Sequence, residues 1–259
     1  MQRHSPAAIR VSVFAPACVF ICVAVLPVFL PAGLNAQTAA KRSVLDGVYT
    51  DAQATRGELA YTKTCAECHD LSFDGTPVEG EGFIDNWREF PLATLYDFIS
   101  TTMPQDNPGE LGKDGYRDVL AYILRRNGYP AGKSDLTEEV IRSTAMVGLD
   151  GPKPLASDTM VKVTGCVMAG PEDSWELSQS TDPVRIRKPD PASPEELHSA
   201  STSPAGPQKF KLLNLDTLPV KPDSFKGLRV LVKGVLVKDS YGARISAMAV
   251  EKVDGSCGR

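Results

Sequence analysis

The chain has 259 residues, of which 42% are hydrophobic, and its formal net charge is −4. This length allows about two modest domains, and the apolar content is enough for a proper core. The charge is uneven, −7 over residues 37–155 and +1 over residues 156–259, which argues against a nucleic-acid-binding protein because such proteins need basic stripes.

Residues 1–36 are predicted to be a signal peptide. Arg3 and Arg10 give a basic start, an apolar run follows from Val11 to Leu30, and small residues lead to Ala36. The run approaches the length of a membrane span, so an uncleaved anchor that faces the periplasm is the alternative. We expect a periplasmic or otherwise exported protein that contacts a membrane only if the leader is retained.

Residues 37–50 are expected to form an N-terminal extension, and residues 51–136 a small all-helical domain. Thr50-Asp-Ala-Gln53 has the form of a capping box, which predicts that a helix starts there and runs into Cys65. Further helices or helical turns are expected over residues 83–87, from Pro91 to just before Met103, and over residues 113–126.

The most informative run is Cys65-Ala-Glu-Cys68-His69. Two thiols on one helical turn can add across the two vinyl groups of a haem, and the histidine that follows is then an axial ligand. A thioredoxin-like pair is the first alternative, but no βαβ pattern surrounds the motif. Half of a zinc site is the second, but a second CxxC or a histidine pair is missing. We therefore predict one covalently bound haem c with its iron.

A haem that only passes electrons needs a second axial ligand. The remaining histidines are His4, in the leader, and His198, in a stretch rich in Pro and Ser, so a thioether is the better candidate. The methionines after the motif are Met103, Met146, Met160, Met168 and Met248. Met103 is favoured, because it lies in the helical domain at the end of a helix and is followed by Pro104. An open or otherwise ligated sixth site is the alternative.

Residues 45–134 resemble a class I monohaem cytochrome c domain. The resemblance rests on Cys65-Ala-Glu-Cys-His69, on Trp87, on Thr102-Met103-Pro104 and on Asn127-Gly-Tyr-Pro130. It implies that the first and last helices cross, with Gly57 and Tyr61 on one meeting Tyr122 on the other. This form of the domain is similar to those fused to or partnering quinoprotein (PQQ) dehydrogenases.

The resemblance also implies roles around the haem. The carbonyl of Pro77 is expected to accept the Nδ1 proton of His69, a bond that orients the ring. Trp87 is expected either to bond a haem propionate through its indole N–H or to fill the core. Asp70 departs from the pattern, since many relatives have glycine at this position.

Residues 137–157 are expected to be a linker with one helical turn, and residues 158–259 a small β-domain. Alternating runs predict strands near residues 160–167, 175–178, 210–213, 228–237 and 244–250. The pattern resembles small OB-like barrels, with a flexible excursion over residues 188–208. Cys166 and Cys257 are a candidate disulfide in an exported protein, with two unpaired thiols as the alternative.

The predicted fold class is thus multidomain, with an all-α cytochrome c domain followed by a small all-β, OB-like barrel. The predicted function is electron transfer, without catalysis of its own, between a dehydrogenase or respiratory complex and another carrier. The dehydrogenase partner includes PQQ-dependent ones. The alternative is a haem enzyme subunit or a sensor with an open sixth site, in which the β-domain binds a ligand or partner.

Overall fold

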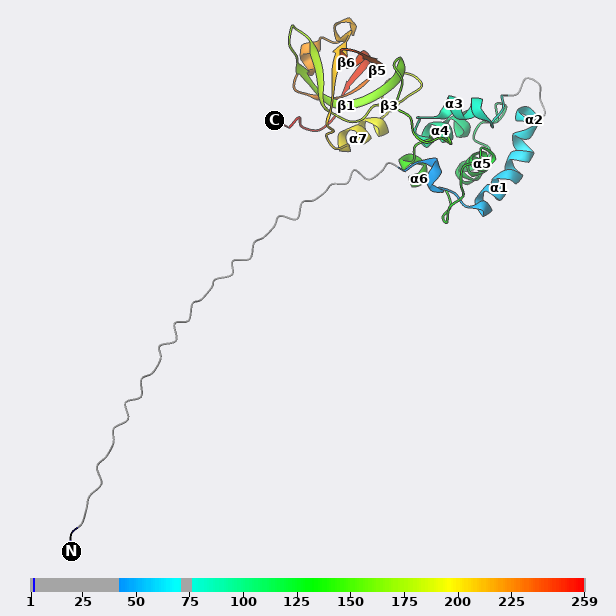
Figure 1. The fold of residues 1–259 in the computed structure, drawn as a ribbon. Helices are drawn as coiled ribbons and strands as arrows, with labels where there is room; N and C mark the ends of the chain where they lie inside the picture. Colours follow the sequence, from blue (N-terminus) through cyan, green and yellow to red (C-terminus); the bar gives the residue numbers. More distant parts are fainter. Residues whose placement is uncertain (1, 3–41, 71–75, 259) are drawn as a thin grey trace. The chain divides into compact units, whose positions relative to one another are not determined.

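The computed structural model describes residue 2, residues 42–70 and residues 76–258, and the predicted leader therefore lies outside the described residues. The described residues from Arg42 onward fall within one compact unit. In that unit a set of helices is followed along the chain by a β-barrel (Figure 1). The predicted succession of an all-α domain and a small all-β domain is confirmed.

The helical part carries one short 3-10 helix and six α-helices among the described residues. They are η1 (Val44–Asp46), α1 (Asp51–Thr64), α2 (Ala66–His69), α3 (Glu81–Trp87), α4 (Leu92–Thr102), α5 (Gly112–Arg126) and α6 (Glu138–Ser143).

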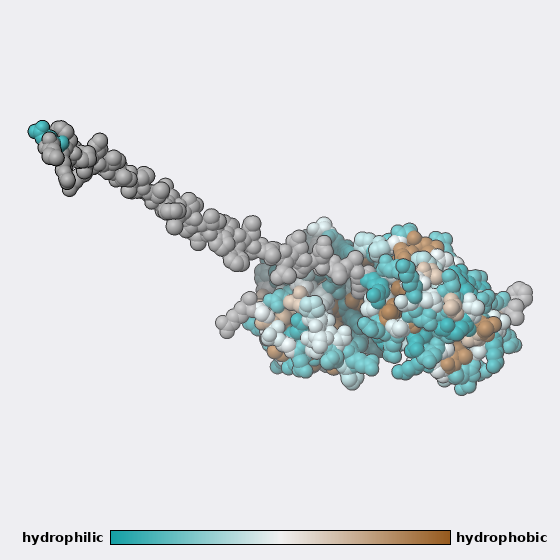
Figure 2. All heavy atoms as spheres, turned by 90° about the horizontal axis from the view of Figure 1, so that it is seen from below, coloured by the Kyte–Doolittle hydropathy of each residue, from teal (hydrophilic) through white to brown (hydrophobic). Residues whose placement is uncertain are grey.

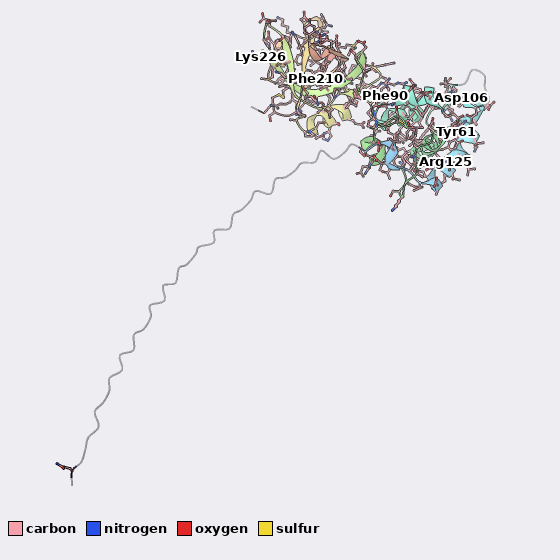
Figure 3. All side chains as sticks on the ribbon, viewed as in Figure 1. Tyr61, Phe90, Asp106, Arg125, Phe210 and Lys226 are labelled. Atoms are coloured by element: carbon pink, nitrogen blue, oxygen red, sulfur yellow. A yellow bond between two sulfur atoms is a disulfide. The ribbon has the colours of Figure 1, made fainter. Side chains whose placement is uncertain are left out.

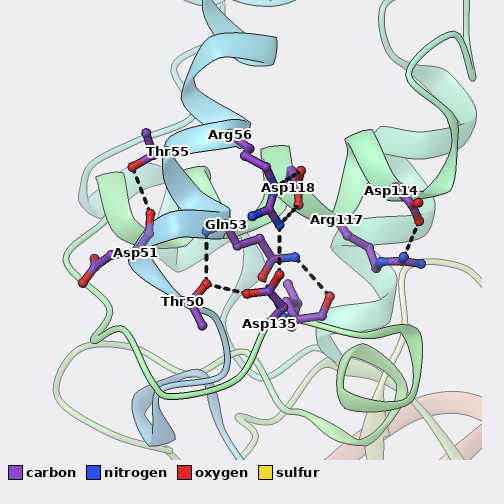
Figure 4. Close-up of polar contacts among 10 residues, drawn as sticks. Thr50, Asp51, Gln53, Thr55, Arg56, Asp114, Arg117, Asp118 and Asp135 are labelled. Carbon is purple, nitrogen blue, oxygen red and sulfur yellow. Dashed lines mark hydrogen bonds and ion pairs between the residues drawn. The ribbon is translucent and has the colours of Figure 1, made fainter.

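The start of α1 is capped on one side only. The backbone N–H of Gln53 donates to Oγ1 of Thr50 over 3.1 Å, as a capping box requires. The Gln53 side chain, however, turns away and exchanges two hydrogen bonds with the backbone of Leu136 (Figure 4). The reciprocal half of the predicted box is therefore wrong, because a buried amide at this position satisfies the backbone of a distant segment.

The helices α1 and α5 pack directly against each other at Gly57. A Cβ atom added to Gly57 would lie 1.8 Å from the carbonyl oxygen of Asp118. One turn further along, the rings of Tyr61 and Tyr122 have centroids 5.1 Å apart. Arg56 adds ion pairs to Asp118 and to Asp135 on the edge of this contact (Figure 4). The crossing implied by the resemblance is thus present.

The segment expected to be a linker over residues 137–157 packs into the helical core as far as Val147. Ile141, Met146 and Val147 are buried there. The hydroxyl of Tyr129 donates to the carbonyl of Val147 over 2.7 Å, and Met146 exchanges backbone hydrogen bonds with residues 89 and 90. Its apolar residues complete the helical core, so this half of the segment is not a free tether.

The β-part contains β1 (Thr159–Ala169), β2 (Trp175–Ser180), β3 (Val184–Arg185), α7 (Pro194–Thr202), β4 (Gln208–Leu213), η2 (Leu215–Thr217), η3 (Pro222–Phe225), β5 (Arg229–Asp239) and β6 (Gly242–Lys252). Among the described residues, five of the strands close into a barrel in the order β1-β2-β4-β6-β5, because β1 pairs with both β2 and β5. The pair β4–β6 is parallel and the others are antiparallel.

The excursion predicted over residues 188–208 contains the helix α7, so its description as flexible was wrong. Ser193 caps the helix by accepting the backbone N–H of Glu196, and Pro194 stands in its first turn. Glu196 then pairs with Lys162 on β1 and with Lys233 on β5 at 2.6 and 2.7 Å. Two strands of the barrel thereby hold the helix in place.

Cys166 on β1 and Cys257 after β6 are joined by a disulfide, with their Cα atoms 5.8 Å apart. The bond ties the beginning of the barrel to the segment that follows its last strand. The two cysteines are 91 residues apart in the sequence. For a loop of this length, chain-entropy models predict a stabilisation of the folded state on the order of 4 kcal/mol.

The surface is mostly hydrophilic on the face seen in Figure 2, where hydrophobic residues form small separate areas. The large hydrophobic side chains exposed among the described residues are Leu59, Phe98, Leu149, Met168, Val220, Leu228, Tyr241 and Met248. The helices that the structure describes include none with the length and apolar character of a membrane span.

Candidate haem site

The motif of residues 65–69 lies where α1 ends and the short helix α2 begins. Cys65 is the C-cap residue of α1, and its carbonyl accepts the backbone N–H of His69 over 3.0 Å. Both motif cysteines are free thiols, Cys65 partly buried and Cys68 exposed. Before haem is attached, burial, with nearby Glu110 and Asp70, raises the pKa of the Cys65 thiol to about 11.

The imidazole of His69 is oriented by a backbone carbonyl. Its Nδ1 lies 2.6 Å from the carbonyl oxygen of Thr76. When Nδ1 carries the proton and donates, Nε2 is left to ligate a metal. We expected the carbonyl of Pro77 here, and the structure places that of the preceding residue instead. A loop sequence does not determine which of two consecutive carbonyls faces inward, because small changes in the backbone dihedrals decide the direction of each.

Met103 and His69 line the same cavity in the helical part. The lining is almost entirely apolar and aromatic and consists of Tyr61, Cys65, His69, Val78, Ile99, Met103, Pro104, Leu111, Tyr116, Val119 and Ile123. Met103 caps α4, and its carbonyl accepts the hydroxyl of Tyr116 over 2.5 Å. The same Tyr116 oxygen accepts the N–H of Gly109, so one buried phenol holds the loop on both sides of Pro104.

The other methionines lie elsewhere among the described residues. Met146 is fully buried in the helical core, and Met168 and Met248 are about half exposed on the barrel. Met160 belongs to β1, and His198 is exposed on α7. Of the candidate second ligands that the structure describes, Met103 is the one that borders the cavity of His69.

The donor set fits a haem c. Two free thiols at the required spacing adjoin a histidine whose Nε2 is available, and a thioether borders the same cavity, which is lined mainly by apolar side chains. Thiols form the covalent bonds, and imidazole and thioether are the usual ligands of a low-spin haem iron.

Trp87 is 4% exposed and belongs to an aromatic cluster rather than to the lining of the cavity. Its ring lies against those of Phe83, Phe90 and Phe98. The guanidinium of Arg187, which follows β3, lies 4.3 Å from the centroid of the Trp87 ring. Packing in the core is therefore what the structure shows for Trp87, and the expected bond to a propionate stays a prediction.

A polar network next to His69 was not found from the sequence, which named Asp70 as a departure from the pattern and Tyr61 for the helix crossing only. The hydroxyl of Tyr61 donates to Asp70 over 2.8 Å. Arg126, at the end of α5, pairs with Asp70 and with Glu79. Figure 3 labels Tyr61 on α1 and Arg125, the residue before Arg126, on α5. Hydrogen bonds from Arg126 hold the pKa of both carboxyls below the ordinary value. Burial and Asp70 raise the pKa of Tyr61.

Comparison with known proteins agrees with this geometry. Residues 52–123 match the model of the family described as cytochrome C oxidase, cbb3-type, subunit III. No curated protein and no solved structure matches the chain. The helical part is therefore a monohaem cytochrome c domain, and it carries a covalently bound haem c with its iron. Such a domain transfers electrons through its haem and works with a redox protein partner.

Proposed function

We propose that the protein is an exported electron carrier whose haem is ligated by His69 and Met103. The observation that carries the ligation is that these two side chains border one apolar cavity. A bound haem c supplies one-electron redox chemistry, and His/Met ligation raises its reduction potential. The chain contributes two ligands held by hydrogen bonds to fixed segments, so that little has to rearrange when an electron passes.

Export is supported by the leader-like sequence of residues 1–36 and by the chemistry of the cysteines. Covalent attachment of haem in bacteria takes place outside the cytoplasm, and a disulfide such as Cys166–Cys257 persists in an oxidising compartment. A protein that keeps its leader would instead be anchored in a membrane, facing the periplasm.

The partners we propose are a dehydrogenase, including PQQ-dependent ones, or a respiratory complex. The charge of −7 over residues 37–155 supports docking to a basic patch on such a partner. The matched family is described as subunit III of a cbb3-type cytochrome C oxidase, which favours the respiratory complex. The OB-like barrel would then serve as a docking or stabilising module.

The ligation is tested by absorption spectroscopy of the purified protein and of Met103→Ala in both oxidation states. The wild type is expected to show a c-type spectrum and the weak long-wavelength charge-transfer band of ferric Met–iron ligation, and Met103→Ala is expected to lose that band. Met168→Ala is the matched control, because this half-exposed methionine on β1 lies outside the cavity.

Two results would contradict the proposal. If the band is absent from the wild type and the ferrous haem readily binds carbon monoxide, the sixth site is open and the protein is a haem enzyme subunit or a sensor. If Met168→Ala also loses the band, the loss does not report ligation by Met103.

A further inference from the structure

One guanidinium group contacts the chain on both sides of the carbonyl that orients His69. Arg126 donates to Asp70, the residue directly after His69, over 2.8 Å. It also grips Glu79 through two parallel hydrogen bonds, from Nε and from Nη2. The Arg126 and Asp70 side chains are 19% and 26% exposed, so their charge-assisted bond is partly shielded from water, whereas Glu79 is 47% exposed and relies on its bidentate geometry.

Asn127, the C-cap residue of α5, contacts the same stretch of chain. The side-chain amide of Asn127 donates to the carbonyl of Val78 over 2.8 Å, and its oxygen accepts the backbone N–H of Gly80 over 3.0 Å. Asn127 is 6% exposed. Arg126 and Asn127 together therefore attach residues 78–80 to the end of the longest helix of the domain.

These contacts act on the histidine from two sides. Thr76, whose carbonyl accepts the Nδ1 proton of His69, lies two residues before Val78. Asp70 is held from the other side by the hydroxyl of Tyr61, and the Arg126 guanidinium lies 5.4 Å from the centroid of that tyrosine ring. A shift of either attachment would change the distance between Nδ1 and the Thr76 oxygen, and with it the donor strength of the imidazole.

We propose that Arg126 is a positioning residue that sets the hydrogen bond between His69 and Thr76 and thereby the reduction potential of the haem. The inference rests on the proposed function. A strong bond from Nδ1 to the carbonyl makes the imidazole a better donor and favours ferric iron, so loosening it raises the potential. Loss of the positive charge of Arg126 alone would lower the reduction potential, because a nearby cation disfavours the ferric state.

The chain contains a matched control for this test. Arg125, the preceding residue, pairs with Glu58 on α1 at 2.7 Å and lies over the ring of Tyr122. Its hydrogen bonds within the described part of the chain go to Thr55 and Glu58 on α1 and not to residues 76–80. Arg125 and Arg126 thus stand at the same helix end with the same charge, each with a glutamate and a tyrosine as partners. They differ in whether they hold the segment that orients His69.

The experiment compares Arg126→Lys with Arg125→Lys in the haem-loaded protein. Lysine keeps the charge but cannot reproduce the planar, bidentate grip. The first readout is the reduction potential, and the second is solvent exchange of the His69 Nδ1 proton, followed by NMR in the ferrous state. In Arg126→Lys we expect a higher potential and faster exchange of the Nδ1 proton, because the hydrogen bond to Thr76 is loosened. Arg125→Lys should match the wild type in both.

Equal behaviour of the two lysine variants would overturn the inference and leave Arg126 as a structural ion pair. If Arg126→Lys fails to fold, Glu79→Gln against Glu58→Gln repeats the exchange measurement from the carboxylate side, with the same expectation and the same overturning result. The haem content of the wild type is measured first. A wild type without covalent haem overturns the proposed function, whereas a loaded wild type with unresponsive variants overturns this inference alone.

Discussion

Gly57 is the residue at which α1 and α5 come into backbone contact. A methyl group there would lie 1.8 Å from the carbonyl of Asp118, and a backbone atom cannot move aside as the end of a flexible side chain can. The close approach also brings Tyr61 and Tyr122 together and places Tyr61 at the wall of the haem cavity. One missing side chain therefore determines the distance between the two helices that build the site.

Gly57→Ala is expected to lower the free energy of unfolding of the haem-loaded protein by about 2–3 kcal/mol, because the two helices must separate to admit the methyl group. The measurement is denaturant unfolding at equilibrium. Gly82→Ala in α3 is the control, since nothing lies within 4 Å of its added Cβ, and it should be neutral or stabilising by up to about 1 kcal/mol. A Gly57→Ala protein as stable as the wild type would contradict the packing described here.

At the scale of single elements, α7 depends on one carboxylate. Glu196 reaches both Lys162 on β1 and Lys233 on β5, and Lys233 is only 4% exposed. Burial alone would raise the pKa of Glu196, but the hydrogen bonds from the two lysines hold it below its ordinary value of 4.5. Protonation of Glu196 would leave the buried Lys233 ammonium with a much weaker partner.

The barrel is therefore expected to lose stability in acid through Glu196. A carboxyl with a lowered folded-state pKa stabilises the fold fully above its unfolded pKa and loses this effect as the pH falls through the folded value. Glu196→Gln should be destabilised at pH ~7, and its stability should change less than that of the wild type between pH ~5 and ~3. Urea unfolding at several pH values measures this. The exposed Glu195 provides the control: Glu195→Gln should follow the wild type, and a parallel loss there would contradict the assignment.

The helix α7 also shows what sequence patterns reveal and what they miss. Strong periodicity predicted α5 to within one residue, and alternation predicted β5 and β6. In α7, the composition rich in Pro and Ser obscured Ser193-Pro-Glu-Glu196, which is itself a capping signal. A helix this short is stable because its glutamate meets lysines on two strands, and no local pattern encodes such a meeting.

The haem site divides in the same way. Cys65, Cys68 and His69 follow from spacing within five residues, and Met103 from its place at a helix end. Arg126 contacts Asp70 and Glu79 across separations of 56 and 47 residues. Partners so far apart along the chain are brought together by the crossing of α1 and α5, so the sequence alone indicated the candidate ligands but not the ion pairs that hold the chain around His69.

At the scale of the whole unit, two arginines after and within β3 contact the helical part. Arg185 donates to the carbonyl of Arg88 over 2.6 Å and lies 4.3 Å from the centroid of the Phe90 ring. Arg187 lies at the same distance from the centroid of Trp87. Cation–π contacts of this kind contribute about 0.5–2 kcal/mol each. The contacts of Arg185 and Arg187 thus bind the barrel to the haem domain noncovalently, in addition to the covalent linker.

Replacing both arginines with alanine is expected to uncouple the two parts. Calorimetry of the wild type should show one cooperative transition, and that of Arg185→Ala/Arg187→Ala two separate ones, with the first lowered because about 1–2 kcal/mol of contact is lost. Lys188→Ala removes a charge from the adjacent exposed position and serves as the control. A single unshifted transition in the double variant would show that the linker alone couples the parts.

The cover that Arg187 gives to Trp87 also bears on how such a chain can be rearranged in evolution. A haem domain separated after residue 157 would lose both arginines and open Trp87 and Phe90 to solvent next to Phe98, which is already 37% exposed. A contiguous apolar patch of this kind favours self-association. The haem domain is thus poorly suited to gene shuffling on its own. A new fusion partner would have to supply side chains that shield this aromatic face, as the barrel does here.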